Sequence, residues 1–263
     1  KAGLKEKTGD GPQKILHLDS GRKYFSKDWH IALLNELAAA GYTHVQLAFG
    51  NNGLRFVLDD MTIEANGTTY DSDALKEGIR QGNYNYGALT GYYVDGAEYL
   101  TETEMDEIIA HGKAVGVEII PHLNMPGHMS ALLDAMEYVG IENPHFYGRG
   151  ESDSSVDLTN EEAINFMYAL TEKYAEYFAS RGCKFYNVGA DEYANDLSSM
   201  GFEGMGATLY TKFVQFLNDA AAIITDLGMT PRAFNDGFYY RDYNISIEPD
   251  KAYEICYWSS GWS

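Results

Sequence analysis

The chain has 263 residues, of which 45% are hydrophobic and 22% are charged, enough to build one large core. Its formal net charge is −20, which argues against nucleic acid or an anionic membrane as a partner. No apolar run reaches the roughly 18 residues of a membrane-spanning helix, so we expect no membrane insertion. Aromatic residues make up 14% of the chain, which suits a sugar-binding cleft and an aromatic core equally well.

The first segments read as strand, helix and strand. Residues 14–21 (KILHLDSG) predict a short buried strand, and a helix is expected over Lys27–Ala40, ended by Gly41. Residues 42–50 (YTHVQLAFG) predict a second strand. The apolar face of this expected helix comprises Trp29, Leu33, Leu34 and Leu37.

A long departure from this alternation follows the second strand. Residues 55–60 and 61–70 suggest a hairpin, because Asn66-Gly67 is a strong tight-turn signal. A polar, Gly- and Tyr-rich stretch then continues to about residue 98 with no element predicted. The run Thr101–Glu104 is a capping box and predicts a helix to about Val115.

The second half returns to regular alternation. Residues 116–124 predict a third strand, and a second capping box at Thr159–Glu162 opens a helix that runs to Arg181. The remaining expected elements are strands at 184–190, 230–237 and 253–260, with a helix from about Ala207 to Leu227 before the fifth strand.

Alternating strands and helices indicate βαβ units around a parallel sheet. A doubly wound sheet would more commonly carry a Gly-rich phosphate turn after its first strand, whereas this chain has DSGRKYF there. Polar and aromatic residues follow all six strands, as at the C-terminal face of a (β/α)8 TIM barrel. We therefore expect a leader or linker over 1–13 and a barrel with about six of eight βα units over 14–263. These strand-end residues are Arg22, Asn51, Asn52, Asn124, His128, Asp191, Glu192, Asp236, Trp258 and Trp262.

Two adjacent acids, Asp191 and Glu192, end the fourth expected strand just after Gly189. Such a pair elsewhere is usually an acidic turn, but this position favours a catalytic role. Like charges repel, so one carboxylate raises the pKa of the other and keeps it protonated as a general acid.

Other candidates carry weaker signals when considered singly. Asp236 could form an Asx turn before Gly237 or bind a ligand, and His128 could pack or cap a helix. Arg22 could form a salt bridge or clamp a hydroxyl, and paired tryptophans at Trp258 and Trp262 suggest a stacking wall.

A metal site made by His122, His128 and the acids is the weaker interpretation of these residues. His122 and His128 are separated by a Pro-Gly turn and lack HxH or HExxH spacing. We expect no metal and no cofactor.

Taken together, the motifs resemble glycoside hydrolase family 20, the β-N-acetylhexosaminidases and lacto-N-biosidases, and above all the catalytic modules of bacterial surface hexosaminidases. They occur in the family's order and span Lys14 to Trp262. The matching stretches are LDSGRKYFS (18–26), GNNGLRF (50–56), NMPGHMSALL (124–133), NVGADEYAND (187–196), FNDGFYY (234–240) and YWSSGW (257–262).

The resemblance implies a retaining, substrate-assisted hydrolysis in which the 2-acetamido group of the sugar is the nucleophile. Asp191 would hold the acetamido N–H, and Glu192 would protonate the leaving oxygen and then activate water. Arg22 would hold sugar hydroxyls and His128 would support the acid. Substrate-binding roles are further implied for Asn124, Asp236, Trp258 and Trp262.

Two features depart from the family pattern. Asn124 stands where many members carry an aspartate, which removes a charge from that position. The family's seventh strand supplies a tyrosine to the acetamido pocket, and the sequence contains no match to strands seven and eight. We therefore expect this chain to be part of a longer polypeptide, poorly folded and inactive when expressed alone.

The resemblance implies glycans ending in N-acetylglucosamine or N-acetylgalactosamine as partners, and an extracellular or cell-surface location. A lacto-N-biosidase, which releases a disaccharide, is the alternative within the family. A non-catalytic glycan-binding fragment and a metal-dependent barrel lyase or isomerase are alternatives from other classes.

Overall fold

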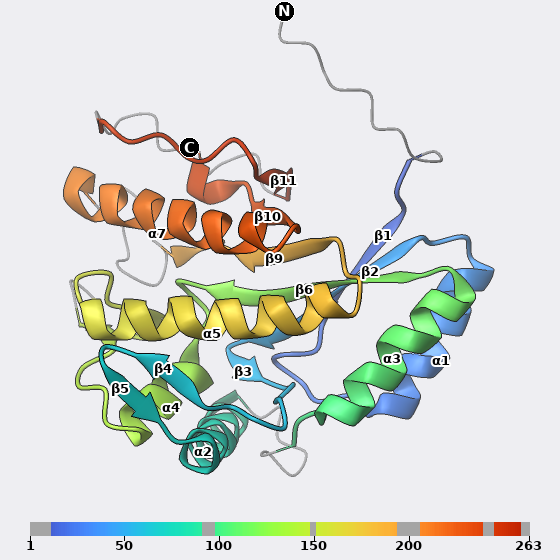
Figure 1. The fold of residues 1–263 in the computed structure, drawn as a ribbon, viewed down its shortest axis with the longest axis horizontal. Helices are drawn as coiled ribbons and strands as arrows, with labels where there is room; N and C mark the ends of the chain where they lie inside the picture. The colour runs from blue at the N-terminus through green and yellow to red at the C-terminus, as the bar shows by residue number, and fades with distance from the viewer. Residues whose placement is uncertain (1–11, 91–97, 148–150, 194–205, 239–244, 259–263) are drawn as a thin grey trace, which may run out of the picture.

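The computed structural model describes residues 12–90, 98–147, 151–193, 206–238 and 245–258, and in them a curled parallel sheet with helices packed on it, a partial (β/α)8 barrel (Figure 1). The predicted fold class is confirmed. The parallel strands, in spatial order, are β1 (Ile15–Asp19), β2 (His44–Asn51), β6 (Glu118–Met125), β9 (Phe185–Gly189), β10 (Thr230–Phe234) and β11 (Glu254–Cys256).

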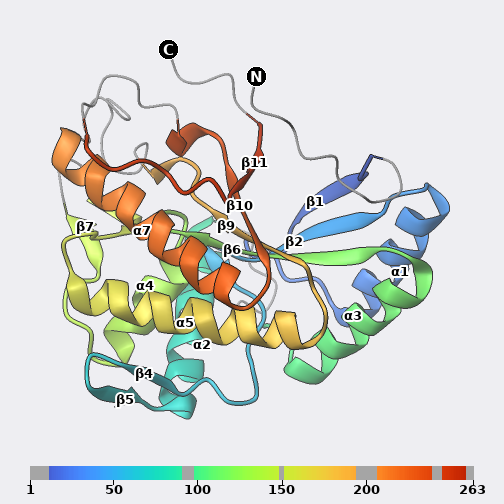
Figure 2. The same cartoon turned by 45° about the horizontal axis from the view of Figure 1, so that its top comes forward.

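Crossover helices connect these strands and cover the outside of the sheet. All eight residues of β2 are buried. Helices α5 and α7 lie side by side over β6, β9 and β10, as both views show (Figure 2). The crossover helices are α1 (Lys27–Ala39), α3 (Glu102–Val115), α5 (Glu161–Ser180) and α7 (Gly206–Asp226).

The long excursion after β2 contains more structure than its composition indicated. The short β3 (Gly53–Leu54) turns back on β2, and β4 (Ile63–Ala65) pairs antiparallel with β5 (Thr68–Tyr70). Asn66 and Gly67 both have positive φ, so the predicted tight turn is confirmed. The segment 55–60, in contrast, forms no hairpin strand.

A helix, α2 (Ser72–Thr90), occupies the stretch for which no element was predicted, and that expectation was wrong. Gly78 and Gly82 in this helix serve packing and do not break it. A Cβ at Gly82 would collide with the backbone of Ala131 in α4 (Ser130–Tyr138), so glycine lets the two helices approach closely. Glycine content alone does not reveal such a contact.

Two further details correct the sequence-based expectations. A hairpin of β7 (His145–Tyr147) and β8 (Glu151–Val156), not predicted, lies between α4 and α5. The N-cap of α5 is Asn160, whose side chain accepts the Ala163 N–H, so the capping box expected at Thr159 is absent. The capping box of Thr101 and Glu104 at α3 is present as predicted.

A short 3-10 helix, η2 (Asp236–Phe238), follows β10 directly and carries Asp236, one of the candidate site residues. Among the described residues, β1 and β11 each pair with a single strand of the main sheet. None of the helices in the described ranges is both long and apolar enough to cross a membrane.

Candidate active site

The two adjacent acids sit on a sharp turn at the C-terminal end of β9. Gly189, Ala190 and Glu192 all have positive φ, at 77°, 67° and 56°. A Cβ at Gly189 would collide with the side chain of Asn124, so glycine is required where β6 and β9 converge. A cluster of sparsely populated backbone conformations is common at functional sites, where the surrounding structure holds the strain.

Asp191 is held as an anion. Its Oδ1 accepts a hydrogen bond of 2.8 Å from Asn124 Nδ2, and its Oδ2 lies 3.5 Å from His128 Nε2. Burial by itself would raise the pKa of Asp191, but His128, His122 and the Asn124 amide outweigh burial and lower it to about 2. The Asp191 side chain keeps 18% of its surface exposed, so the charge remains accessible.

Glu192 points toward the same histidine from the next residue. His128 Nε2 lies 3.1 Å from Glu192 Oε2, and the Glu192 side chain is 31% exposed. Its backbone N–H donates to Asp236 Oδ2 at 2.7 Å. The two acids are therefore adjacent in sequence and share one histidine, while their other contacts differ.

His128 occupies the turn between β6 and α4, with φ of 53° and little exposed surface. Its Nδ1 lies 3.5 Å from Arg22 Nη2, an N–H donor. In the neutral ring this contact makes Nδ1 the acceptor, so Nε2 carries the hydrogen and donates to Glu192. Its carbonyl also accepts the Asn52 N–H, which ties the turn to the end of β2.

A chain of polar contacts runs from β1 to Asp191. Asp19 Oδ2 accepts from Arg22 Nη1 at 2.9 Å and from Asn51 Nδ2 at 3.0 Å. Asn51 Oδ1 in turn accepts from Asn124 Nδ2 at 3.2 Å. Burial lowers the pKa of Arg22, but the opposing effect of the Asp19 carboxylate is part of a net rise, so the guanidinium stays charged. Sequence reasoning missed Asp19, although a carboxylate at the end of a predicted strand was an available signal.

Asp236 and Trp258 form the other side of the cluster. Asp236 Oδ1 accepts the indole N–H of Trp258 at 3.0 Å, and Asn235 Oδ1 accepts the Trp258 backbone N–H at 2.7 Å. Burial raises the pKa of Asp236, opposed by the hydrogen bonds from Glu192 and Trp258. The Trp258 residue is 45% exposed at the rim. Trp262, the second expected wall residue, lies outside the described residues.

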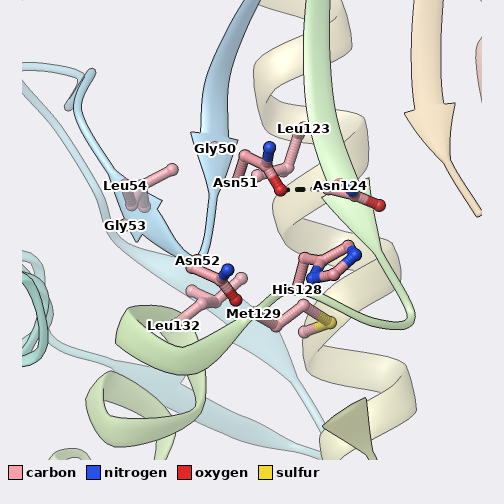
Figure 3. Close-up of a pocket in the computed structure, with 10 residues that line it drawn as sticks. All are labelled: Gly50, Asn51, Asn52, Gly53, Leu54, Leu123, Asn124, His128, Met129 and Leu132. Atoms are coloured by element: carbon pink, nitrogen blue, oxygen red, sulfur yellow. Dashed lines mark hydrogen bonds between the residues drawn. The ribbon is translucent and has the colours of Figure 1, made fainter. Parts of the chain in front are cut away.

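A small pocket lies on the β2 and α4 side of His128, with an empty volume of about 180 Å³ (Figure 3). Asn51, Asn124 and His128 converge on it, and the hydrogen bond between the two asparagines crosses its edge. Asp191 and Glu192 do not line it. The pocket therefore lies between His128 and the residues of β2 and α4, and it is separate from the space next to Asp191 and Glu192.

The candidate metal ligands come together only in part, because His122 is not among the residues that cluster with His128. His122 is fully buried inside the sheet near His17, with ring centroids 5.5 Å apart, and burial lowers its pKa to about 3. The ligand atoms of His128, Asp191 and Glu192 do lie within 4.8 Å of one another, a spacing that could also hold a cation. The hydrogen bond from His128 to Glu192 accounts for the arrangement without one.

Comparisons with known proteins agree on one family. The sequence profile described as "Glycosyl hydrolase family 20, catalytic domain" matches residues 14–241. The lacto-N-biosidase of Bifidobacterium bifidum is 29% identical over 170 residues, covering 60% of this chain and 15% of that protein. Beta-hexosaminidase B of Pseudoalteromonas piscicida is 28% identical over 257 residues, covering 84% of this chain and 32% of that protein.

Solved structures give the same picture. The tandem GH20 catalytic modules of the pneumococcal exo-beta-D-N-acetylglucosaminidase StrH match with a TM-score of 0.89 and 43% identity, over 95% of this chain and 59% of that chain. Dispersin B matches with a TM-score of 0.64 and 21% identity over 94% of this chain and 65% of that chain, a likeness of fold alone. The chain spans less than two thirds of the length of each of these relatives.

Proposed function

The chain belongs to glycosyl hydrolase family 20, and on this premise we propose that it releases terminal β-linked N-acetylhexosamine from glycans as a retaining glycosidase. The observation that carries the proposal is the pair of adjacent acids contacting one histidine, with Asp191 held as an anion by Asn124. Two carboxylates so close cannot be an acid and a water-activating base on opposite sides of a sugar ring. Family 20 enzymes are exceptions to that two-carboxylate scheme because the substrate supplies its own nucleophile.

In the proposed first step, the 2-acetamido carbonyl oxygen attacks the anomeric carbon and the glycosidic C–O bond breaks. Glu192 gives its proton to the leaving oxygen, and the sugar becomes a cyclic oxazolinium ion. The Asp191 carboxylate accepts the acetamido N–H and stabilises the positive charge that develops on the ring. A pKa of about 2 suits this role, because the carboxylate stays charged at neutral pH.

In the proposed second step, the Glu192 carboxylate takes a proton from water, which attacks the anomeric carbon and reopens the oxazolinium ring. Two displacements at one carbon retain its configuration. His128 Nε2, 3.1 Å from Glu192 Oε2, supports the carboxylate form of Glu192 between the steps. Arg22 would hold sugar hydroxyls with the N–H groups that Asp19 leaves accessible, and Trp258 would stack on the sugar.

The substrate class follows from the relatives and is part of the proposal. StrH is a pneumococcal exo-beta-D-N-acetylglucosaminidase that recognises and hydrolyses N-glycans, which favours N-acetylglucosamine-terminated glycans and an extracellular or cell-surface location for this chain. The 29% identity to a lacto-N-biosidase keeps release of a disaccharide as the second candidate. The ordered network around Asp191 and Glu192 argues against a purely glycan-binding role.

The test is hydrolysis of aryl β-N-acetylglucosaminide, aryl β-N-acetylgalactosaminide and aryl lacto-N-bioside, measured side by side with a purified polypeptide that contains this chain within a complete (β/α)8 barrel. We expect turnover of the first substrate, unaffected by a chelator. Turnover of the lacto-N-bioside alone would establish the second candidate. Loss of activity with a chelator, restored by a divalent cation, would contradict the proposed mechanism and point to the three-ligand cluster at His128. Binding of N-acetylglucosamine-terminated glycans with no hydrolysis would favour the non-catalytic alternative.

A further inference from the structure

Asp236 lies between two parts of the site, the backbone of Glu192 and the ring of Trp258. It is buried, with 2% of its surface exposed, in η2 directly after β10. Its Oδ2 accepts the backbone N–H of Glu192 at 2.7 Å, and its Oδ1 accepts the indole N–H of Trp258 at 3.0 Å. The Asp236 carboxylate therefore holds both the backbone of Glu192 and the indole ring of Trp258 at the rim of the site.

The chemistry of this position calls for a carboxylate. Both neighbours of Asp236 are N–H donors, and an ionised carboxylate offers only acceptors. An asparagine would offer one oxygen and one NH2 group, so one of the two N–H groups would face another donor. A buried donor left unpaired in this way is costly.

The surroundings leave these contacts little freedom to adjust. Glu192 has a φ of 56°, a conformation that non-glycine residues seldom adopt, so its N–H direction depends on a firm partner. A Cβ at the neighbouring Gly237 would collide with the ring of Phe213, which shows how closely η2 is packed. Asn235 fixes the backbone of Trp258 from the same turn.

We propose that Asp236 is a positioning residue that couples the indole of Trp258 to the backbone of Glu192, and not a ligand of the sugar. The proposal rests on the proposed function in taking Glu192 as the general acid. Because Asp236 has only 2% of its surface exposed and its two oxygens face the N–H groups of Glu192 and Trp258, it acts on the substrate through these neighbours. It sets the stacking ring and the proton donor at a fixed separation, so that a sugar against the ring presents its leaving oxygen to Glu192.

The test is a double-mutant cycle of Asp236→Asn and Trp258→Phe, with kcat and KM measured on aryl β-N-acetylglucosaminide. In the wild-type background Asp236→Asn should lower kcat by about 10²-fold, since small misplacements of catalytic groups have effects of that size. Trp258→Phe removes the second donor, so the amide oxygen can turn to the Glu192 N–H. In that background the same change should lower kcat less than about 10-fold. Asp219→Asn is the matched control, because Asp219 also accepts from two side chains, Tyr168 and Gln215, on the helical layer.

A second readout does not depend on activity. The chain has three tryptophans, and ¹⁵N-labelled tryptophan gives one indole N–H resonance for each. Trp258→Phe identifies its resonance, which Asp236→Asn should shift and Asp219→Asn should leave in place. If Asp236→Asn fails to fold, wild-type spectra recorded down a pH series replace it, and the Trp258 resonance should move as Asp236 becomes protonated.

The outcomes separate this inference from the proposed function. Equal effects of Asp236→Asn in both backgrounds, or an unmoved Trp258 resonance, would overturn the coupling even if hydrolysis is confirmed. A lower melting temperature with unchanged kcat would show a purely structural role and would also overturn it. A shifted resonance in a protein that hydrolyses none of the aryl substrates would support the link from Asp236 to Trp258 and refute the proposed function.

Discussion

Replacing Asp191 by asparagine tests the assignment of the acetamido group as nucleophile. The change keeps the shape of the side chain, and its oxygen can still accept the Asn124 amide that now lies 2.8 Å from Oδ1. What is lost is the negative charge beside the developing oxazolinium ion. Removing one electrostatic contact of this type costs about 10²–10³-fold in kcat, or roughly 3–4 kcal/mol. We expect a loss in that range for the aryl N-acetylglucosaminide.

The structure also gives the magnitude on the stability side. The pKa of Asp191 is lowered from 3.8 to about 2, and each unit corresponds to about 1.36 kcal/mol, so the fold favours the anion by an amount on the order of 2 kcal/mol. The stabilisation that comes from a lowered carboxyl pKa is present above the unfolded pKa of 3.8, and it is lost as the pH falls toward 2. Asp191→Asn should therefore flatten the acid side of the stability curve between about pH 4 and pH 2.

The decisive assay compares two inhibitors on the same variant. A thiazoline that mimics the cyclised intermediate carries the charge distribution that Asp191 contacts, whereas the product sugar does not. Asp191→Asn should weaken thiazoline binding more than binding of N-acetylglucosamine, measured at pH 7 on a variant that is less stable than the wild type but still folded. Equal weakening of both ligands, or trapping of a covalent glycosyl-enzyme, would refute the reasoning.

Three further predictions follow from the same cluster. Glu192→Gln cannot donate a proton, so hydrolysis of oligosaccharides should fall by about 10²–10⁴-fold and aryl substrates with good leaving groups should suffer less; near-normal oligosaccharide hydrolysis would exclude Glu192 as the acid. Asn124→Asp places a second carboxyl at the 2.8 Å contact with Asp191, so the pKa of the Asp191 carboxyl should rise and the acid limb of the kcat/KM profile should move to higher pH. An unmoved acid limb would show that Asn124 does not hold Asp191 as an anion. Gly189→Ala introduces a side chain at φ of 77° against Asn124, so the free energy of unfolding should drop by about 1–3 kcal/mol, and wild-type stability in denaturant would contradict the close contact of β6 and β9.

The sequence by itself determined the sheet and the place of the acids. Strand and helix periodicity is a local property, so the alternation from residue 14 onward predicted the parallel strands and the crossover helices between them. Parallel strands deliver their C-terminal ends to one face, and that rule alone predicts that Arg22, Asp191 and Asp236 lie in one neighbourhood.

Only the tertiary structure decided how those residues divide their roles. Helix α2 escaped prediction because its glycines are explained by contacts with α4, far along the chain. The anionic state of Asp191 depends on Asn124, 67 residues away, and the backbone of Glu192 depends on Asp236, 44 residues away. Hydrogen bonds between side chains on different strands leave no periodic trace in the sequence, since their partners are chosen by the register and closeness of strands that pack only in the folded protein.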